Sequence, residues 1–354
     1  MPKISVLMSA YNCADTIDEA VESICAQSFG NFEFLITDDG SEDDTWQVLQ
    51  RLAAKDDRLQ LFRNTRNRGL AESVNALVAE SSGEYIARMD ADDVALPSRF
   101  DKQVEILDSG KADLCGGWMI LFGGWSEAIR NTCTTDEEIR ADLLFAGAIC
   151  QPTVMMRRHL LEQITYDTAM IPAADYDLWT RIAPHAKLYN IPEPLTRYRV
   201  HPGQISSRKK ELQTEITARI AVRQLAALEF ALPEDEKMVF KELVRRETPR
   251  SVRHIRLAAG LMNRLITHFD GLPAAQKVIA MRWYRYCLTA GPIGPRAFWL
   301  FCRAEVTRYG SFQKWQYLAV GLLTMLHIRH SSRIYQWLTS KSPDSKVTNA
   351  YNQR

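Results

Sequence analysis

The chain has 354 residues, of which 46% are hydrophobic and 25% are charged, so its composition excludes a disordered protein and its length allows more than one domain. The formal net charge of +1 hides two unequal parts, because residues 1–236 hold 24 Lys and Arg against 38 Asp and Glu, whereas residues 237–341 hold 18 against 4. The acidic part suits metal binding and argues against a nucleic acid partner, and the basic part suits an anionic surface or an anionic acceptor.

Short apolar strands alternate with helices in the first 90 residues. The strands are predicted at residues 4–8, 32–37, 59–63 and 85–89, with helices of about a dozen residues between them. Such alternation is typical of right-handed βαβ units, whose strands lie parallel in one sheet. The pattern therefore predicts an α/β fold with a doubly wound, mainly parallel sheet.

The later part of the chain is less regular. An extended segment at residues 113–122 contains paired glycines that interrupt it, and Pro192 with Pro194 marks a turn. Further helices are predicted at residues 97–107, 136–145 and 175–182, and from residue 211 onward the pattern is almost wholly helical. The chain is therefore expected to comprise a sheet domain at 1–210, a basic helical C-terminal region at 211–341 and a frayed polar tail at 342–354.

Polar clusters follow three of the predicted strands. They are Ala10-Tyr11-Asn12, Asp38-Asp39-Gly40-Ser41 and Asp90-Ala91-Asp92-Asp93. In an open parallel sheet, ligands bind at the carboxyl ends of the strands, so five carboxylates are expected to converge on one rim. Like charges gathered in this way are costly unless a cation joins them, and oxygen ligands suit Mg²⁺ or Mn²⁺ carrying a diphosphate. Each cluster alone is equally typical of a turn or a helix cap.

The order and spacing of these clusters resemble a known family. Residues 3–205 are similar to the family 2 inverting nucleotide-sugar glycosyltransferases, which have the GT-A fold. The similarity is carried by residues 5–12, by Asp38-Asp39-Gly40-Ser41, by Asn67-Arg68-Gly69-Leu70, by residues 83–93 and by Asp175-Tyr176-Asp177-Leu178-Trp179.

The resemblance implies a role for each donor-site residue. Ala10, Tyr11 and Asn12 would line the pocket for the base and ribose, Asp39 would accept a hydrogen bond from the nucleobase, usually uracil, and Asp90 would face the ribose. Asp92 would be the main metal ligand, with Asp93 as a second ligand or a cap. Residues 198–204 resemble a segment that closes over the diphosphate, in which Arg199 would bind phosphate and His201 the metal; Arg68 would approach the nucleotide, or belong only to a turn.

Asp175 is the expected general base. Inversion by direct displacement requires a carboxylate on the face opposite the leaving group, where it removes the proton of the acceptor hydroxyl. The family has a Glu-Asp pair at the start of a helix, and here the pair is Ala174-Asp175, so the first acid is missing. An alternative is that Asp175 only stabilises the helix N-terminus, which is the role expected for Asp177.

The basic C-terminal third mixes arginine with large apolar residues. Basic amphipathic helices with Trp and Phe lie in membrane interfaces, and an anionic lipid-linked acceptor would bind the same face. The alternative is a helical domain whose apolar faces pack together and whose arginines are solvated. The relevant segments are residues 282–286, 298–301 and 315–326.

The cysteines and the apolar runs bear on location. The seven cysteines are scattered without a C-x-x-C pair, which is typical of reduced cytoplasmic thiols. The start of the chain lacks a signal-peptide pattern, and no apolar run reaches the ~20 residues of a membrane span. We therefore expect a protein that is cytoplasmic or peripheral on the inner face of the cell membrane.

Three functions follow from these patterns. The first is an inverting glycosyltransferase that moves a sugar from a nucleotide diphosphate sugar, UDP-linked, to a hydroxyl of a saccharide or lipid-linked saccharide, in cell-surface polysaccharide or glycolipid biosynthesis. The second is a sugar-phosphate nucleotidyltransferase, which would open with a Gly-rich basic loop that residues 8–12 lack. The third is a non-catalytic scaffold that binds nucleotide sugars through Asp39 and Asp92.

Overall fold

The computed structural model describes residues 1–124, 126–201 and 209–340, so the predicted tail at 342–354 lies outside the described residues. The chain divides into two compact units. The first comprises residues 1–136 and 147–210, and the second comprises residues 137–146 and 211–354. The short segment 137–146, which the sequence places with the sheet domain, thus groups with the helical part.

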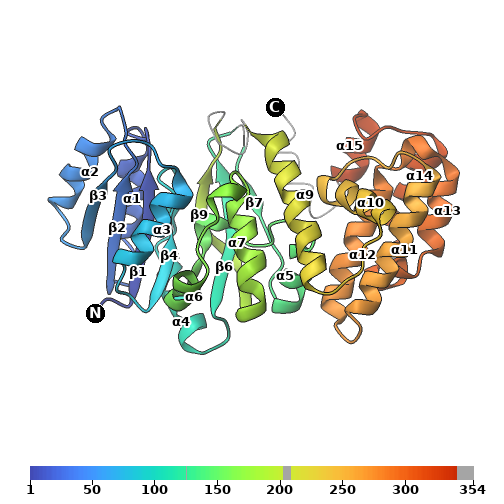
Figure 1. The fold of residues 1–354 in the computed structure, drawn as a ribbon. Helices are drawn as coiled ribbons and strands as arrows, with labels where there is room; N and C mark the ends of the chain where they lie inside the picture. The colour runs from blue at the N-terminus through green and yellow to red at the C-terminus, as the bar shows by residue number, and fades with distance from the viewer. Residues whose placement is uncertain (125, 202–208, 341–354) are drawn as a thin grey trace. The chain divides into compact units, whose positions relative to one another are not determined.

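The first half of the first unit is a parallel βαβ arrangement (Figure 1). β1 pairs in parallel with β2 and β4, and β2 pairs in parallel with β3. The strands are buried on both faces, as near-continuous apolar runs require. The elements are β1 (Ile4–Ala10), α1 (Ile17–Cys25), β2 (Phe32–Asp38), α2 (Thr45–Ala53), β3 (Leu59–Arg63), α3 (Leu70–Glu80) and β4 (Tyr85–Arg88).

The second half of this unit turns the sheet into a mixed one. The strand order is β3-β2-β1-β4-β8-β6-β9-β5, with β7 paired to β6, and β8 runs antiparallel to both β4 and β6. The predicted α/β class is confirmed, with the parallel strands concentrated in β1 to β4. The added elements are β5 (Val94–Ala95), α4 (Arg99–Asp108), β6 (Leu114–Phe122), β7 (Ala128–Arg130), β8 (Met155–Arg157), α6 (Arg158–Gln163), α7 (Ala174–Ile182) and β9 (Leu188–Arg199).

The turn predicted at Pro192 and Pro194 is wrong. β9 continues through both prolines and pairs in parallel with β6. The pairing register shifts on either side of Trp118, whose partner is Pro194, and such an irregularity tolerates a residue without an N–H donor. The glycines of β6 do not break the strand either: a Cβ on Gly116 would lie 2.5 Å from the Asn190 side chain, so glycine permits a close approach of β9.

The second unit is helical. Its core contains the buried rings of Trp283 and Phe301, whose centroids lie 6.5 Å apart. Pro273 and Pro295 begin helices, where proline's missing N–H is not needed. Among the described residues, no helix combines the length and the apolar character of a membrane span. The helices are α5 (Asp136–Leu143), α9 (Lys210–Ala227), α10 (Glu234–Arg245), α11 (Val252–His268), α12 (Pro273–Leu288), α13 (Pro295–Arg303), α14 (Lys314–Met325) and α15 (Arg333–Ser340).

Candidate active site

The first two polar clusters form one connected layer at the carboxyl ends of β1 and β2. The Asp39 N–H donates to the Ala10 carbonyl at 2.8 Å, and the Asn12 N–H donates to the Ser41 hydroxyl at 3.0 Å. The Asn12 side chain accepts from the N–H of Glu42 at 2.9 Å. Asn12 has φ of 47°, a left-handed conformation that Asn adopts more readily than most residues. The predicted convergence of these two clusters is therefore present.

Asp39 holds the loop at residues 64–69 by hydrogen bonds that the sequence did not predict. Its buried carboxylate accepts from the Asn64 amide at 2.7 Å, from the N–H of Arg68 at 2.9 Å and from the N–H of Gly69 at 2.8 Å. The Arg68 guanidinium pairs with Glu72, the Nε lying 2.7 Å from Oε1. This loop lines an open hollow of about 530 Å³, whose wall consists of Thr65, Arg66, Asn67, Arg68 and Glu72.

Tyr11 completes the N-terminal cluster. Its side chain is 45% exposed, next to the buried end of β1. An exposed aromatic ring at a strand's carboxyl end is available to a ligand such as a nucleobase. The roles of Ala10, Tyr11, Asn12, Asp39 and Arg68 toward a nucleotide stay predictions, because the contacts above describe only the protein's own framework.

The cluster after β4 brings together the two predicted metal ligands. Asp92 and His201, 109 residues apart in the chain, have their Oδ2 and Nε2 atoms 3.2 Å apart. Both side chains are accessible, with 31% of Asp92 and 42% of His201 exposed. Within the described part of the chain, no group of three or more His, Cys, Asp or Glu side chains is arranged to hold a metal. A carboxylate with an imidazole therefore fits a cation that completes its shell with water or ligand oxygens.

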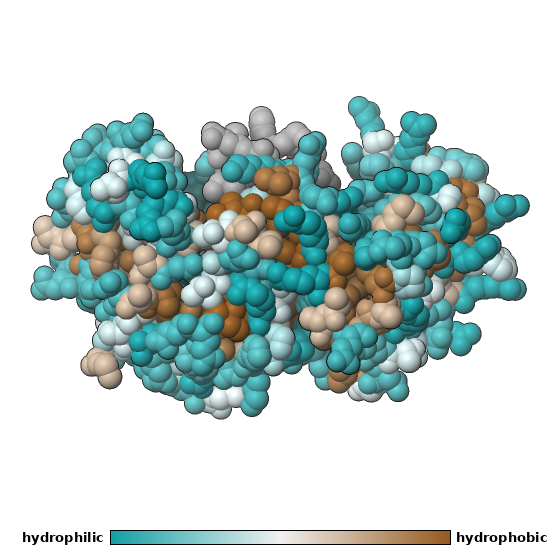
Figure 2. Space-filling view, in the orientation of Figure 1, coloured by the Kyte–Doolittle hydropathy of each residue, from teal (hydrophilic) through white to brown (hydrophobic). Residues whose placement is uncertain are grey.

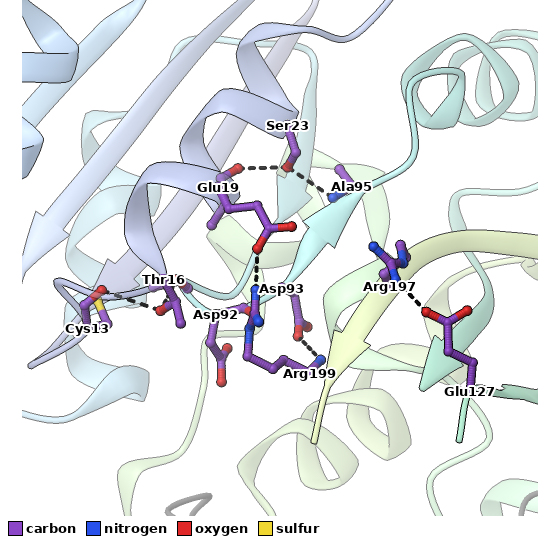
Figure 3. Close-up of polar contacts among 12 residues, drawn as sticks. Cys13, Thr16, Glu19, Ser23, Asp92, Asp93, Ala95, Glu127, Arg197 and Arg199 are labelled. Atoms are coloured by element: carbon purple, nitrogen blue, oxygen red, sulfur yellow. Dashed lines mark hydrogen bonds and ion pairs between the residues drawn. The ribbon is translucent and has the colours of Figure 1, made fainter. Parts of the chain in front are cut away.

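Asp93 and Arg199 hold this loop in place (Figure 3). The fully buried Asp93 carboxylate accepts from the backbone N–H of Arg199 at 2.8 Å. The Arg199 Nε donates to the Asp92 carbonyl at 2.8 Å, and its Nη2 pairs with Glu19 of α1. Burial, followed by the neighbouring charges of Asp90 and Asp92, raises the pKa of Asp93 well above its usual value. Arg199 thus positions the Asp92 backbone, and its predicted contact with phosphate stays a prediction.

Replacing Arg199 with alanine should weaken the cation site without removing a ligand. The loss of the Asp92 carbonyl contact and of the Glu19 ion pair is expected to lower metal affinity by about 10–100-fold. Titration calorimetry with Mn²⁺ measures this. Arg197→Ala is the matched control, because Arg197 also lies against the Phe122 ring and pairs with the surface residue Glu127. Equal losses in the two variants would contradict the positioning role.

Asp90 lies between the cation site and the end of β4. Its Oδ1 is 3.2 Å from Nη2 of the fully buried Arg88, which also donates to the Leu7 carbonyl. Burial, together with the carboxylates of Asp92 and Asp175 and against the opposing Arg88 charge, raises the pKa of Asp90 to about 6. The charge of Asp175 thus acts on Asp90.

The shifted pKa of Asp90 predicts how stability depends on pH in the absence of metal. An Asp in an unfolded chain titrates near ~3.9, so between about pH 4 and pH 6 the folded protein holds a proton that the unfolded chain has lost. The free energy of unfolding should therefore fall as the pH rises through this range. Asp90→Asn is expected to remove about 1–2 kcal/mol of that fall. Urea unfolding in EDTA at several pH values tests this, and an identical pH slope in the variant would refute it.

Asp175 occupies the first turn of α7. Burial raises its pKa, and hydrogen bonds from the N–H groups of Tyr176 and of Asp175 itself, together with the Arg130 charge, oppose the rise. Asp177 is different: it is fully buried and bonded to the Arg181 Nε at 2.7 Å. Asp177 is thus bonded within α7, whereas the charge of Asp175 acts on Asp90.

Tyr166, whose surroundings include the charge of Asp175, was missed by sequence reasoning. Tyr166 is buried, its pKa is raised chiefly by burial, and the charges of Asp175 and Asp90 act on it. Its hydroxyl accepts from the Gln151 amide at 2.6 Å, and the Gln151 Oε1 is buried without a hydrogen-bond partner among the described residues. No local motif marks Tyr166, so only the fold reveals its place.

The first unit begins with a parallel βαβ half, whose last strand is followed by an acidic loop. A mixed half follows, and its helix α7 carries carboxylates. This arrangement defines the GT-A class of glycosyltransferase folds. Among solved structures, S. aureus TarS 1-349 in complex with UDP-GlcNAc shares the fold with a TM-score of 0.53. The match covers 80% of this chain and 90% of that chain at 18% identity, which is evidence for the fold alone.

Sequence comparisons give the family. The model for glycosyl transferase family 2 matches residues 5–165. EpsE of Bacillus subtilis (strain 168), named as a glycosyltransferase, is 31% identical over 259 residues, which span 71% of this chain and 91% of the relative. The chain belongs to glycosyl transferase family 2 and is a glycosyltransferase, which confirms the predicted resemblance.

A further relative carries a more specific name. It is the UDP-Glc:alpha-D-GlcNAc-diphosphoundecaprenol beta-1,3-glucosyltransferase WfaP of Escherichia coli, 30% identical over 236 residues. The match spans 63% of this chain and 88% of WfaP. Membership of the glycosyltransferase family sets aside the nucleotidyltransferase alternative.

Proposed function

We propose that the protein is a metal-dependent, inverting glycosyltransferase that transfers a sugar from a UDP-linked donor to a hydroxyl of a saccharide, carried on a lipid. The observation on which the proposal depends is the pairing of Asp92 with His201 beside the carboxylates of Asp90 and Asp175. The similarity to WfaP supports the donor and acceptor classes, because its name specifies UDP-Glc and a sugar on diphosphoundecaprenol.

The donor's nucleotide is assigned to the layer formed by the first two clusters. The loop that Asp39 holds lines the hollow beside Arg68, and the exposed Tyr11 ring follows β1 in the same layer. Oδ1 of Asp39 already accepts two hydrogen bonds from the protein, whereas Oδ2 accepts one and can therefore also accept from a uracil N–H. Ala10 and Asn12 connect β1 to this layer through their bonds to Asp39 and Ser41.

The metal site is assigned to Asp92 and His201, with Mn²⁺ or Mg²⁺ as the ion. A divalent cation bound there supplies neutralisation of the charge that develops on the leaving diphosphate. Burial and then the neighbouring carboxylates raise the pKa values of Asp90 and Asp93, and a bound cation would relieve the repulsion among these carboxylates. Asp93 and Arg199 keep the loop rigid, so that Asp92 is already oriented when the donor enters.

The transfer step is assigned to Asp175. The acceptor oxygen forms a bond to the anomeric carbon from the face opposite the diphosphate, the bond from that carbon to the diphosphate oxygen breaks, and Asp175 takes the hydroxyl proton. Burial raises the pKa of Asp175, which makes its carboxylate a better proton acceptor than an exposed one.

A lipid-linked acceptor implies work at a membrane surface. We place the protein at the cytoplasmic face as a peripheral protein, on the strength of the basic residues 237–341, which hold 18 Lys and Arg against 4 Asp and Glu. We expect the product to become part of a cell-surface polysaccharide or glycolipid.

A thermal-shift screen of nucleotides tests the donor and metal assignments. UDP with Mn²⁺ at about 100 times its dissociation constant should stabilise the protein by ~2.7 kcal/mol, or several degrees in Tm. EDTA should abolish the effect, and GDP with Mn²⁺ is the specificity control. If neither UDP nor a UDP-sugar shifts Tm in the presence of metal, the proposed function is wrong. A non-catalytic scaffold would show the shift but release no UDP.

A further inference from the structure

Exposed apolar side chains form a strip on α13 and α14. Leu318, Leu322 and Met325 recur on one side of α14 with the i, i+4, i+7 spacing, and Trp299 projects from α13. These four side chains are 42% to 71% exposed. Single exposed apolar residues are common on proteins, but a contiguous group is typical of an interaction surface. Figure 2 shows brown surface at the position that α13 and α14 occupy in Figure 1, surrounded by teal.

A hollow joins the two helices within this strip. It has a volume of about 690 Å³, and Trp299 of α13 and Met325 of α14 both line it. The rest of its wall consists of Val252, Arg256, Pro295, Arg296, Phe298, Leu300 and Cys302. The strip and its hollow are therefore one continuous surface with an apolar floor.

The charges at this surface are all positive. Arg256 of α11 and Arg296 of α13 line the hollow, and neither forms an ion pair or hydrogen bond within the described part of the chain. The Arg303 guanidinium lies 4.2 Å from the centroid of the Trp299 ring. No carboxylate lines the hollow. Arginines free of acidic partners around exposed Trp, Leu and Met are the combination that binds an anionic lipid interface, where the apolar groups enter the acyl boundary and the guanidiniums meet phosphate.

We propose that the face formed by Trp299, Leu318, Leu322 and Met325, with Arg256 and Arg296 at its hollow, docks onto an anionic lipid bilayer. The proposal rests on the proposed function in one respect, since it names the surface by which the enzyme meets the membrane that carries its acceptor. Residues 237–341 have a net charge of +14, which favours binding to anionic lipid over binding to a protein surface that is basic or poor in acidic residues.

Flotation of the full-length protein with vesicles tests the proposal. The wild type should float at physiological salt with phosphatidylcholine vesicles that contain phosphatidylglycerol and stay behind with phosphatidylcholine alone. Trp299→Gln combined with Leu322→Gln and Met325→Gln should reduce the floated fraction roughly tenfold, as should Arg256→Glu combined with Arg296→Glu. The matched control is Leu212→Gln with Met238→Gln and Leu272→Gln, three exposed apolar residues on other parts of the helical unit, and it should float like the wild type.

Unchanged flotation of both strip variants would overturn the proposal. The proposal would also be overturned if light scattering showed that the apolar variant loses a dimer while its flotation is unchanged. The strip would then join two copies of the chain. Release of UDP from a donor by each variant separates this inference from the proposed function. Wild-type flotation without any UDP release refutes the function and leaves the docking surface, whereas UDP release without flotation refutes only the docking surface.

Discussion

Asp92→Asn is expected to abolish metal-dependent donor binding and to lower transfer by about 10²–10³-fold. The substitution keeps the size of the side chain but removes the negative charge that faces His201 at 3.2 Å. Without that charge, the imidazole of His201 would be the remaining ligand of the pair for a divalent cation. The cation would then bind weakly, and the diphosphate would lose its counter-charge. UDP affinity measured by calorimetry with and without Mn²⁺ is the direct readout.

The controls for this variant separate a lost ligand from a loosened fold. Asp101→Asn changes an exposed carboxylate of α4 that contacts only the Ser28 hydroxyl, and it should bind UDP as the wild type does. His201→Ala should weaken Mn²⁺-dependent binding less than Asp92→Asn, because it removes a neutral ligand. If Asp92→Asn retained Mn²⁺-dependent UDP affinity, the cation would be bound elsewhere.

Asp175→Asn is expected to leave donor and metal binding intact while transfer falls by ~10²–10⁴-fold. The amide keeps the size of the side chain, but it cannot take a proton as the carboxylate does. The fall should be in kcat with little change in the KM of the donor. Single-turnover transfer to a saccharide acceptor, beside UDP affinity on the same preparation, measures both.

Asp177→Asn provides the comparison on the same helix. This buried carboxylate is bonded to Arg181, so its loss should lower the free energy of unfolding by about 1–3 kcal/mol and reduce kcat far less. Full transfer by Asp175→Asn would move the base to another group. Loss of kcat in Asp177→Asn with unchanged stability would identify Asp177 as that group.

At Ala174 this chain departs from the family that it resembles. The resembling family carries an acidic residue immediately before the base, and here the preceding residue has no polar atoms in its side chain. The structure supplies other polar groups around Asp175, including the Tyr166 hydroxyl, which accepts from Gln151 and is influenced by the charges of both Asp175 and Asp90.

The sequence by itself determined the local elements and the acidic clusters. Strands β1 to β4 and their helices were predictable because apolar periodicity and turn residues act over windows of a few residues. The clusters containing Asp39, Asp92 and Asp175 were visible because their spacing to these elements is also local. The family follows from the same residues.

Only the tertiary structure decided which of these residues meet and what holds them. The contact of Asp92 with His201 and the bonds from Arg199 to Asp92 and Glu19 join parts of the chain separated by more than a hundred residues. Such contacts depend on strand order and register, which no local pattern encodes. The same reason explains the error at Pro192 and Pro194, whose place in β9 is permitted by an irregular pairing with β6. Residues 137–146 group with the helical unit because their apolar side chains join its core, a choice made by packing rather than by chain order.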